Sequence, residues 1–429
     1  MKKMIITIGL GILPFILLAQ AGHIMQGIGA INMSMGGAAT AQPLDINGAL
    51  QWNPAAISAF ETKVFSFNAG AFFSSPVLSS TVPTSGGPFS GVTNDARGVS
   101  VMPALAMVWG NKKSKHTFGV SAFGVSGFGV TFPESNTNPI NMPQSQGGFG
   151  RIQSDYQLLQ IGLTYSYKIN EHLSIGLAPT FNYSSLELAP NPLSSPSQTL
   201  GYPVSDKATA LGLGGQVGIF YNSGKGIKLG ISYKSPQFFG NFDFKNTYLN
   251  GDKAPNVPFK MNYPAILSAG IGYSMNTFDL ALDYRFVNYE NTDGFNAKGW
   301  TNTASVAGFG WKNMSIISAG IQYKGIHKLP IRIGYTYSSN PISSELAFFS
   351  TPATAVIKNA FQFGLGYECS HRLTLNAVYH HGTSDGSASG PLLNPMMITA
   401  SNPYGAIPNS NVSYKMTTDL VMIGINYSF

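Results

Sequence analysis

Residues 159–168 read LQIGLTYSYK, and this stretch decides the fold because its side chains alternate strictly in character. Large side chains and small or polar ones fall on opposite faces: Leu159, Ile161, Leu163, Tyr165 and Tyr167 against Gln160, Gly162, Thr164, Ser166 and Lys168. A period of two predicts a β-strand, because successive strand side chains point to opposite faces. A helix would not separate the two classes in this way.

The same alternation recurs in residues 173–183 and 331–338. In each case Leu, Ile, Phe and Tyr form one face, and mostly Gly, Ser, Thr and Asn form the other. A soluble barrel would fill its interior with the large apolar residues. A membrane barrel turns them toward lipid and keeps the small and polar residues inside. The low charged fraction of 10% and the aromatic fraction of 12% agree with a membrane barrel.

The connections between these segments alternate in length. Short ones lie near residues 110–115, 169–172, 222–226, 274–277, 325–328 and 368–372. Long ones, rich in Pro, Gly, Ser and Asn, lie near residues 74–98, 133–150, 189–205, 246–259, 291–310, 340–355 and 384–412. Outer-membrane barrels have short periplasmic turns and longer outer loops. The sequence therefore predicts an all-β, antiparallel transmembrane barrel of about fourteen strands.

A short repeat marks one end of these strands. Glycine, an aliphatic residue, any residue and tyrosine recur, ending at Tyr165, Tyr221, Tyr273, Tyr323, Tyr367 and Tyr427. We interpret these tyrosines as the lower aromatic girdle, at the periplasmic interface. The chain itself ends in an alternating strand, residues 420–429, whose last residue is Phe429.

The first residues predict export. Lys2 and Lys3 precede an apolar run, and Ala19-Gln20-Ala21 has the small-x-small pattern of a signal-peptidase site. We expect a signal peptide over residues 1–21, with cleavage before Gly22. Its removal lowers the formal charge from +7 to +5, and no Lys/Arg run supports nucleic-acid binding.

Few residues suggest catalysis or a cofactor. The single Cys369 excludes an internal disulfide framework and argues against a thiolate zinc site. His380 and His381 are adjacent on a strand, so they face opposite sides and form a poor metal chelate. We favour an interfacial or loop-edge position for both. We expect no enzyme, no metal and no cofactor, and no phosphate-binding loop motif is present.

Residues 22–60 do not have a strand pattern, although they precede the first strand. A lumen about fourteen strands wide is too large for its wall side chains to fill, so we expect this segment to plug it. The domain organisation is then a plug over residues 22–60 and a barrel over residues 61–429.

This plug resembles the N-terminal hatch of the FadL family, the outer-membrane transporters of long-chain fatty acids and aromatic hydrocarbons. The residues that carry the resemblance are Met35-Gly36-Gly37-Ala38, the neighbourhood of Asp45, and Asn53-Pro54-Ala55. Further along the chain, residues 229–236, 332–335 and 425–429 are also similar to that family.

The resemblance implies a mechanism as well as a fold. In such proteins outer loops capture the ligand, an apolar pocket holds it, and a gap at a kinked third strand releases it sideways into the membrane. Residues 125–130 match that strand, and they include Ser126, Gly127, Phe128 and Gly129. Glycine often marks a bulge or bend, although these two could also be ordinary small lumen residues.

Fatty-acid members of the family hold the carboxylate with basic residues, one of which should fall near residues 187–190. No Lys or Arg is present there, which favours a neutral aromatic or other hydrophobic ligand. Lys234, Arg285 and Arg332 have lumen parity and are candidate headgroup contacts. The alternative is a structural ion-pair network with Asp283 and Glu368.

Leu420 and Met422 have the lumen parity of the last strand. They would suit a hydrophobic pocket or would pack against the hatch. The leading hypothesis is a monomeric outer-membrane channel for passive uptake of hydrophobic small molecules, in contact with outer-membrane lipid. A porin for polar solutes, a lipid hydrolase and a structural or adhesive barrel remain as alternatives.

Overall fold

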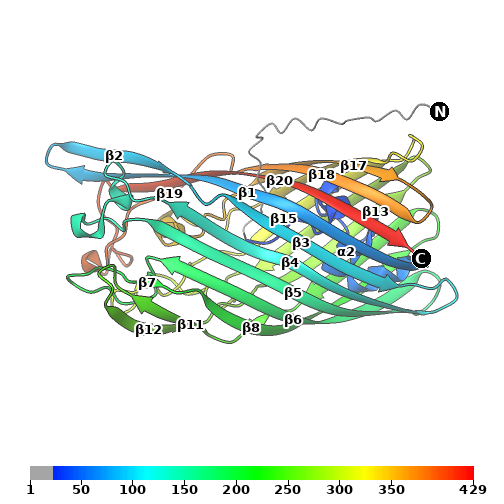
Figure 1. The fold of residues 1–429 in the computed structure, drawn as a ribbon, viewed down its shortest axis with the longest axis horizontal. Helices are drawn as coiled ribbons and strands as arrows, with labels where there is room; N and C mark the ends of the chain where they lie inside the picture. Colours follow the sequence, from blue (N-terminus) through cyan, green and yellow to red (C-terminus); the bar gives the residue numbers. More distant parts are fainter. Residues whose placement is uncertain (1–22) are drawn as a thin grey trace, which may run out of the picture.

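The computed structural model describes residues 23–429, so the signal peptide predicted for residues 1–21 lies outside the described part. Consecutive alternating segments pair with one another to form one elongated barrel (Figure 1). Its wall strands are β1 (Lys63–Thr84), β3 (Val99–Trp109), β4 (His116–Phe132), β5 (Ile152–Lys168), β6 (Leu173–Ala189), β8 (Ala208–Asn222), β9 (Ile227–Lys234), β13 (Ala265–Ser274), β14 (Phe278–Asn288), β15 (Met314–Tyr323), β16 (Ile331–Ser338), β17 (Asn359–Glu368), β18 (Leu373–Thr383) and β20 (Asn411–Ser428).

The barrel is closed by its first and last strands. β1 pairs antiparallel with β20, from Val64 opposite Ser428 to Thr81 opposite Asn411, and with β3 on its other side. Closure pairs the first and last strands with each other, as the interior of a membrane requires of a spanning sheet. The fourteen-strand antiparallel barrel predicted from the sequence is thereby confirmed.

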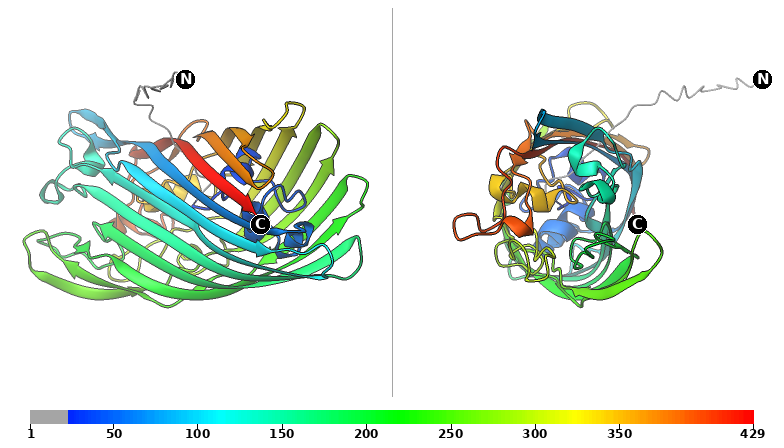
Figure 2. Two further views of the ribbon diagram at one scale, coloured as in Figure 1. Left: turned by 45° about the vertical axis from the view of Figure 1, so that its right-hand side comes forward. Right: turned by 90° about the vertical axis from the view of Figure 1, so that its left-hand side faces the viewer.

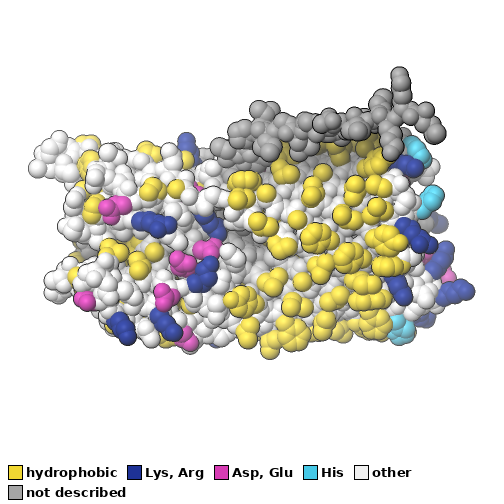
Figure 3. Space-filling view, in the orientation of Figure 1, with side chains coloured by type: hydrophobic (Ala, Val, Ile, Leu, Met, Phe, Trp, Pro, Cys, Tyr) yellow, Lys and Arg dark blue, Asp and Glu magenta, His cyan; other side chains and the backbone are white. Residues whose placement is uncertain are grey.

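The two faces of the wall have the predicted character. In β5, Ile161 and Leu163 are 43% and 48% exposed on the outside, whereas Gln160 and Thr164 are buried inside. Hydrophobic side chains form a broad band around the half of the barrel nearer the C-terminus (Figure 3). Charged side chains gather beyond this band at both ends, as in a barrel surrounded by lipid.

The connections follow the predicted alternation, with one correction. Short turns lie at the end that carries the C-terminus, and long loops lie at the other end (Figure 1). Residues 74–98, predicted as a loop, instead extend β1 to Thr84 and form a hairpin with β2 (Gly87–Asn94). Among residues 23–429, no helix is long and apolar enough to span a membrane.

The loop end contains further short elements. β10 (Phe238–Phe239) and β19 (Ala388–Gly390) extend the main sheet, and β7 (Val204–Ser205), β11 (Phe242–Thr247) and β12 (Lys253–Phe259) form a separate small sheet. The long connection after β9 therefore begins earlier than the predicted residues 246–259. Four 3-10 helices lie in the outer loops: η2 (Pro139–Asn141), η3 (Gln144–Gln146), η4 (Ser344–Ser350) and η5 (Pro395–Met397).

The segment before β1 fills the lumen. It contains α1 (Ala30–Ser34), α2 (Ile46–Trp52) and η1 (Pro54–Ala59), and the view along the barrel shows these helices inside the wall (Figure 2). Every residue from 23 to 58 is buried, apart from the half-buried Pro43 and Leu44. Asp45 caps α2 by accepting a hydrogen bond from the Gly48 amide, at 3.1 Å. We call residues 23–60 the hatch.

Candidate functional site

An ion pair from the wall holds the first loop of the hatch. Asp283 Oδ2 accepts hydrogen bonds from the Ala39 and Thr40 amides, both at 2.9 Å, and pairs with Arg285 at 2.7 Å. Arg285 also donates to the Gly37 carbonyl, and its guanidinium lies 3.8 Å from the Trp52 ring centre. Both ionic side chains are about 1% exposed, so removing either would leave the other buried and unpaired.

Asn53 joins the hatch to the wall. Its Nδ2 donates to the Thr40 carbonyl at 2.8 Å and to the Ile219 carbonyl of β8 at 3.0 Å. Its Oδ1 accepts from the Ala55 amide at 3.1 Å, which caps η1. Pro54 begins η1, and the Ala55 carbonyl accepts from Ser166 of β5 at 3.0 Å. The motif that carried the family resemblance therefore holds the hatch in place.

Inward glycines of the wall let the hatch backbone come close. A Cβ atom at Gly320 would lie 2.5 Å from the Met35 carbonyl oxygen. A Cβ at each of five other wall glycines would also meet a hatch atom: Gly176, Gly218, Gly230, Gly334 and Gly364. Four of these six glycines begin a Gly-aliphatic-x-Tyr match: Gly218, Gly230, Gly320 and Gly364. The repeat predicts the girdle tyrosines, but it does not by itself indicate that its glycines let the hatch backbone approach the wall.

The first residues of the hatch pair with β4 at a bulge. The register of β4 against β5 shifts between Gly124 and Ser126, leaving Val125 as the extra residue. The Met25 amide donates to the Val125 carbonyl and the Gly127 amide donates to the His23 carbonyl, both at 3.1 Å. Ser126 Oγ donates to that same carbonyl at 2.7 Å. The bulge thus presents backbone groups inward, where the hatch binds them.

Above the bulge, β4 separates from β3. The two strands pair only from Ala104–Phe123 to Trp109–Phe118, whereas β3 remains paired with β1 up to Val99. Pro103, the next residue of β3, has no amide hydrogen with which to extend the ladder toward β4. The separation lies in the third strand of the barrel wall, within the stretch that the family resemblance implied.

The gap between β3 and β4 is a cavity of about 810 Å³, which we call the side opening. Its lining includes buried inward residues, Tyr156 and Leu158, and also outward residues of the apolar band, Leu159 and Tyr183. Ser126, Gly127 and Phe128, predicted from the sequence, line it as well. A small molecule in this cavity can therefore contact both the lumen and the membrane side of the wall.

An ionic cluster bounds the outer side of this opening. Asp155 of β5 pairs with Arg97 at 2.5 Å and with Lys207 at 2.8 Å. The Arg97 guanidinium lies directly against Gly129, where a Cβ would collide with it. Gly129 is thus needed for the packing of Arg97 and does not itself line the cavity, unlike its three predicted neighbours.

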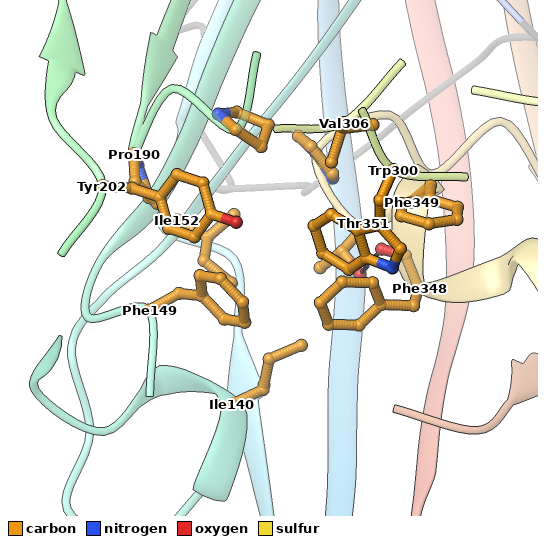
Figure 4. A pocket seen from close by; sticks show the side chains of 12 residues that line it. Ile140, Phe149, Ile152, Pro190, Tyr202, Trp300, Val306, Phe348, Phe349 and Thr351 are labelled. Carbon is orange, nitrogen blue, oxygen red and sulfur yellow. Dashed lines mark hydrogen bonds between the residues drawn. The ribbon is translucent and has the colours of Figure 1, made fainter. Parts of the chain in front are cut away.

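Three apolar cavities lie among the outer loops. The outermost, of about 330 Å³, shares Ile140, Phe149, Tyr202, Trp300 and Phe348 with a deeper one of about 50 Å³. The deeper cavity is shown in Figure 4, where aromatic and aliphatic side chains from several loops converge on it. A third cavity, of about 20 Å³, shares four residues with the second: Pro192, Val306, Phe349 and Pro352.

An aromatic cluster connects these cavities with the side opening. Phe309 lines the innermost loop cavity and lies 6.0 Å from Phe128, which lines the opening. His23 of the hatch is fully buried in this cluster, with six aromatic rings within 6.4 Å: Phe128, Tyr156, Tyr263, Tyr289, Phe295 and Trp311. Sequence reasoning did not find this cluster, because its members come from the hatch, two wall strands and two outer loops.

The His23 ring is held in its neutral form. It stacks on Phe295 at 4.9 Å, and its Nδ1 lies 2.7 Å from the Tyr289 hydroxyl. Its Nε2 is buried with no hydrogen-bond partner among the described residues. Burial among apolar rings disfavours the imidazolium and lowers the pKa of His23 to about 3.

The three candidate headgroup residues differ in their free bonding capacity. Arg285 is occupied by Asp283, Gly37 and Ser318. Arg332 donates to Gln322 and Asn376 and does not pair with Glu368. Lys234 is 3% exposed, and its ammonium has one hydrogen bond within the described chain, to Gln160 at 3.2 Å. Lys234 therefore makes the fewest hydrogen bonds of the three candidates.

Other predicted residues lie inside the wall or at the interface. Leu420 and Met422 point inward and are buried in the apolar core that also contains hatch residues; neither lines a cavity described above. His380, expected at an interface or loop edge, is instead buried in the lumen beside Gln362. His381 faces outward and bonds to Asp419, as opposite strand faces require.

The closed barrel, the helical hatch in its lumen and the side opening define the protein as an outer-membrane β-barrel with a plugged lumen. A family model described as "Outer membrane protein transport protein (OMPP1/FadL/TodX)" matches residues 19–428, so the chain belongs to this family of outer-membrane transport proteins. No curated protein sequence matches it.

Solved structures show the same fold at low sequence identity. The chain is similar to the Pseudomonas putida toluene transporter TodX, with 18% identity, 94% and 99% of the two chains covered and a TM-score of 0.68. For a Pseudomonas aeruginosa FadL homologue these values are 13%, 95%, 100% and 0.71. For the Ralstonia pickettii toluene transporter TbuX they are 16%, 94%, 99% and 0.62.

Proposed function

We propose that the protein is a passive channel that takes up neutral hydrophobic small molecules through the outer membrane. The observation that carries this proposal is the side opening, because its lining continues from lumen residues to residues that face lipid. The names of the relatives support the ligand class, since TodX and TbuX are described as toluene transporters. A ligand would move from the loop cavities past Phe309 and Phe128 to the opening.

The candidate site residues take different parts in this pathway. Ser126, Gly127 and Phe128 would contact the ligand in the side opening, whereas Gly129 would keep Arg97 in place at its border. Asn53, Pro54 and Ala55 would gate the lumen by fixing the hatch. A ligand can shift the hatch only through a difference in affinity between its two positions.

Two further pairs of candidate residues would support the ligand path without being its main ligand contacts. Leu420 and Met422 would supply apolar packing next to the hatch. Arg285 and Arg332 make three and two hydrogen bonds to other groups and Lys234 makes one, so Lys234 is the first candidate to contact a carboxylate ligand. The apolar lining of the loop cavities, which contains no charged side chain, favours a neutral ligand.

The proposed organisation of the chain follows the same division. We assign residues 1–21 to a signal peptide, 22–60 to the hatch and 61–429 to the barrel. The barrel would work as a monomer in contact with outer-membrane lipid, without catalysis.

Uptake by whole cells tests this function. Cells that lack their own hydrophobic channels would express the protein or an empty vector, and uptake of labelled toluene, oleate and a small sugar would be compared. We expect faster toluene uptake with the protein and no change for the sugar. Faster sugar uptake without any toluene effect would instead indicate a porin, and no change for any solute would favour a structural barrel.

Lys234→Gln separates the two hydrophobic ligand classes. It removes the candidate cation that makes the fewest hydrogen bonds to the protein, while keeping a polar side chain of similar length. Toluene uptake should remain at the wild-type rate, because a neutral ligand needs no cation. If oleate enters and Lys234→Gln lowers only the oleate rate, the channel also recognises carboxylates.

A further inference from the structure

The periplasmic turns carry unpaired positive charge. Seven exposed cationic side chains lie in these turns; Lys324 pairs with the buried Asp279 at 2.9 Å, and the other six are Lys112, Lys113, Lys115, Lys225, Lys328 and Arg372. We call these six the basic rim. The same end of the barrel exposes three carboxylate side chains, Glu61, Glu171 and Glu368. Among the described residues, the rim makes one ion pair, a long contact of 3.8 Å between Lys112 and Glu61.

The loop end of the barrel is different. Some of its cations pair with nearby carboxylates, as in Lys260 with Asp293 at 3.3 Å and Lys358 with Asp385 at 3.2 Å. Arg97 and Lys207 share Asp155 in the same way. The loop end also exposes seven carboxylate side chains, against three at the periplasmic end, so the net positive charge of the chain lies mainly at the periplasmic end.

The basic rim lies immediately beyond the lower tyrosine girdle. Lys225 follows Tyr221 by four residues, and Lys328 and Arg372 follow Tyr323 and Tyr367 by five. Those tyrosines are 37–55% exposed on the outer surface, where such rings mark the boundary of the apolar layer. Lysine side chains extend several ångströms from such a boundary and place their charge in the headgroup layer.

The cations are also spread around the circumference. The turns that carry them join β3 to β4, β8 to β9, β15 to β16 and β17 to β18, which lie at separate positions around the closed wall. A single globular partner would meet only part of such a ring. Lipid molecules surrounding the barrel would meet all of it.

We propose that the basic rim binds the phosphate groups of anionic phospholipids in the periplasmic leaflet of the outer membrane. Each cation near a charged membrane surface strengthens the attraction about fivefold at low salt. The ring would select anionic over zwitterionic lipid at this end of the barrel and help to hold it at a fixed depth. This interaction does not depend on the transported ligand.

Trp109 provides a local probe of the lipid beside the rim. It ends β3, one residue before the turn that contains Lys112, Lys113 and Lys115, and it is 38% exposed. The full-length mature protein would be reconstituted in mixtures of phosphatidylcholine and phosphatidylglycerol, with bromine on the acyl chains of one lipid at a time. Quenching of Trp109 then reports which lipid lies next to it, after subtraction of the signal from a Trp109→Phe variant.

We expect phosphatidylglycerol to be preferred about tenfold at low salt, and the preference to disappear in molar salt. Lys112→Gln, Lys113→Gln and Lys115→Gln combined should abolish it. The matched control removes three exposed cations from the loop end, Lys245→Gln, Lys253→Gln and Lys298→Gln, and should retain it. Equal quenching by both lipids in the wild-type protein, or an equal loss in the control, would overturn the proposal and leave the rim to a soluble acidic partner.

Discussion

The buried side-chain amide of Asn53 connects three parts of the protein. Its three hydrogen bonds connect the loop before α2, the start of η1 and wall strand β8. Asn53→Ala leaves the Thr40 and Ile219 carbonyls without this donor, and losses of this kind cost roughly 1–3 kcal/mol. We predict that the hatch opens more often, by at least about fivefold, in amide hydrogen exchange of residues 38–56.

Asn276→Ala is the matched control, because Asn276 is exposed in a periplasmic turn. It should leave hatch exchange unchanged. If Asn53→Ala also exchanges at the wild-type rate, the amide does not secure the hatch, and the role assigned to this motif is incorrect.

His23 makes the docking of the hatch terminus dependent on pH. Its pKa is about 3 when it is docked, whereas a released imidazole has the ordinary pKa of 6.5. Acid therefore favours the released form, because only that form takes up the proton. Docking should be fully stable above about pH 6.5 and weaken by up to tenfold per pH unit as the pH falls toward 3.

Hydrogen exchange of residues 24–28, corrected for intrinsic rates, measures this effect between pH 7.5 and 5. His23→Phe retains a ring in the aromatic cluster but cannot be protonated, so its exchange should be independent of pH. An identical pH response in wild-type and His23→Phe proteins would assign the titration to another group.

At the scale of elements, the hatch packs closely against the wall because inward-facing wall positions are glycines, which have no side chain. A Cβ at Gly320 would come within 2.5 Å of the Met35 carbonyl oxygen, and contacts at least as close occur at five other wall glycines. We predict that Gly320→Ala leaves the barrel folded but displaces the loop around residues 34–37. Hydrogen exchange of this loop should rise about tenfold, while heat-resistant migration of the barrel on gels remains unchanged.

Gly240→Ala serves as the control, since a Cβ at Gly240 has no atom within 4 Å. Both variants add one methyl group, at Gly320 within β15 and at Gly240 between β10 and β11. Equal exchange in the two variants would contradict the close-approach explanation.

The wall elements could be predicted because lipid imposes a strict rule on their outer faces. Residues 159–168 alternate clearly, and β5 contains all of them. The β1–β2 hairpin was missed because it extends beyond the apolar band, where residues 77–94 mix Ser, Thr, Val and Pro without that rule. The irregularity in β4 was predicted at Gly127 and Gly129. In the structure the extra residue of the bulge is Val125, whose carbonyl accepts a hydrogen bond from the hatch.

At the scale of the whole molecule, the transport path could not be read from the sequence. Its lining comes from separate loops, and the pairing of Phe128 with Phe309 joins residues 181 positions apart in the chain. Likewise, no local pattern indicates that His23 lies among Tyr263, Phe295 and Trp311. The resemblance to a known family implied the general route, and the proposed function assigns specific side chains to it.

The central claim is that ligand leaves the lumen through the side opening. Gly124 lies within that opening, and a Cβ there has no atom within 4 Å, so the side chain of Gly124→Trp would begin in open space inside the gap. The most direct measurement is toluene uptake by cells with Gly124→Trp, compared with Gly240→Trp as an equally bulky change elsewhere. The account predicts at least a tenfold loss for Gly124→Trp and a wild-type rate for Gly240→Trp. A wild-type rate for Gly124→Trp in correctly folded protein would contradict the account and require another exit.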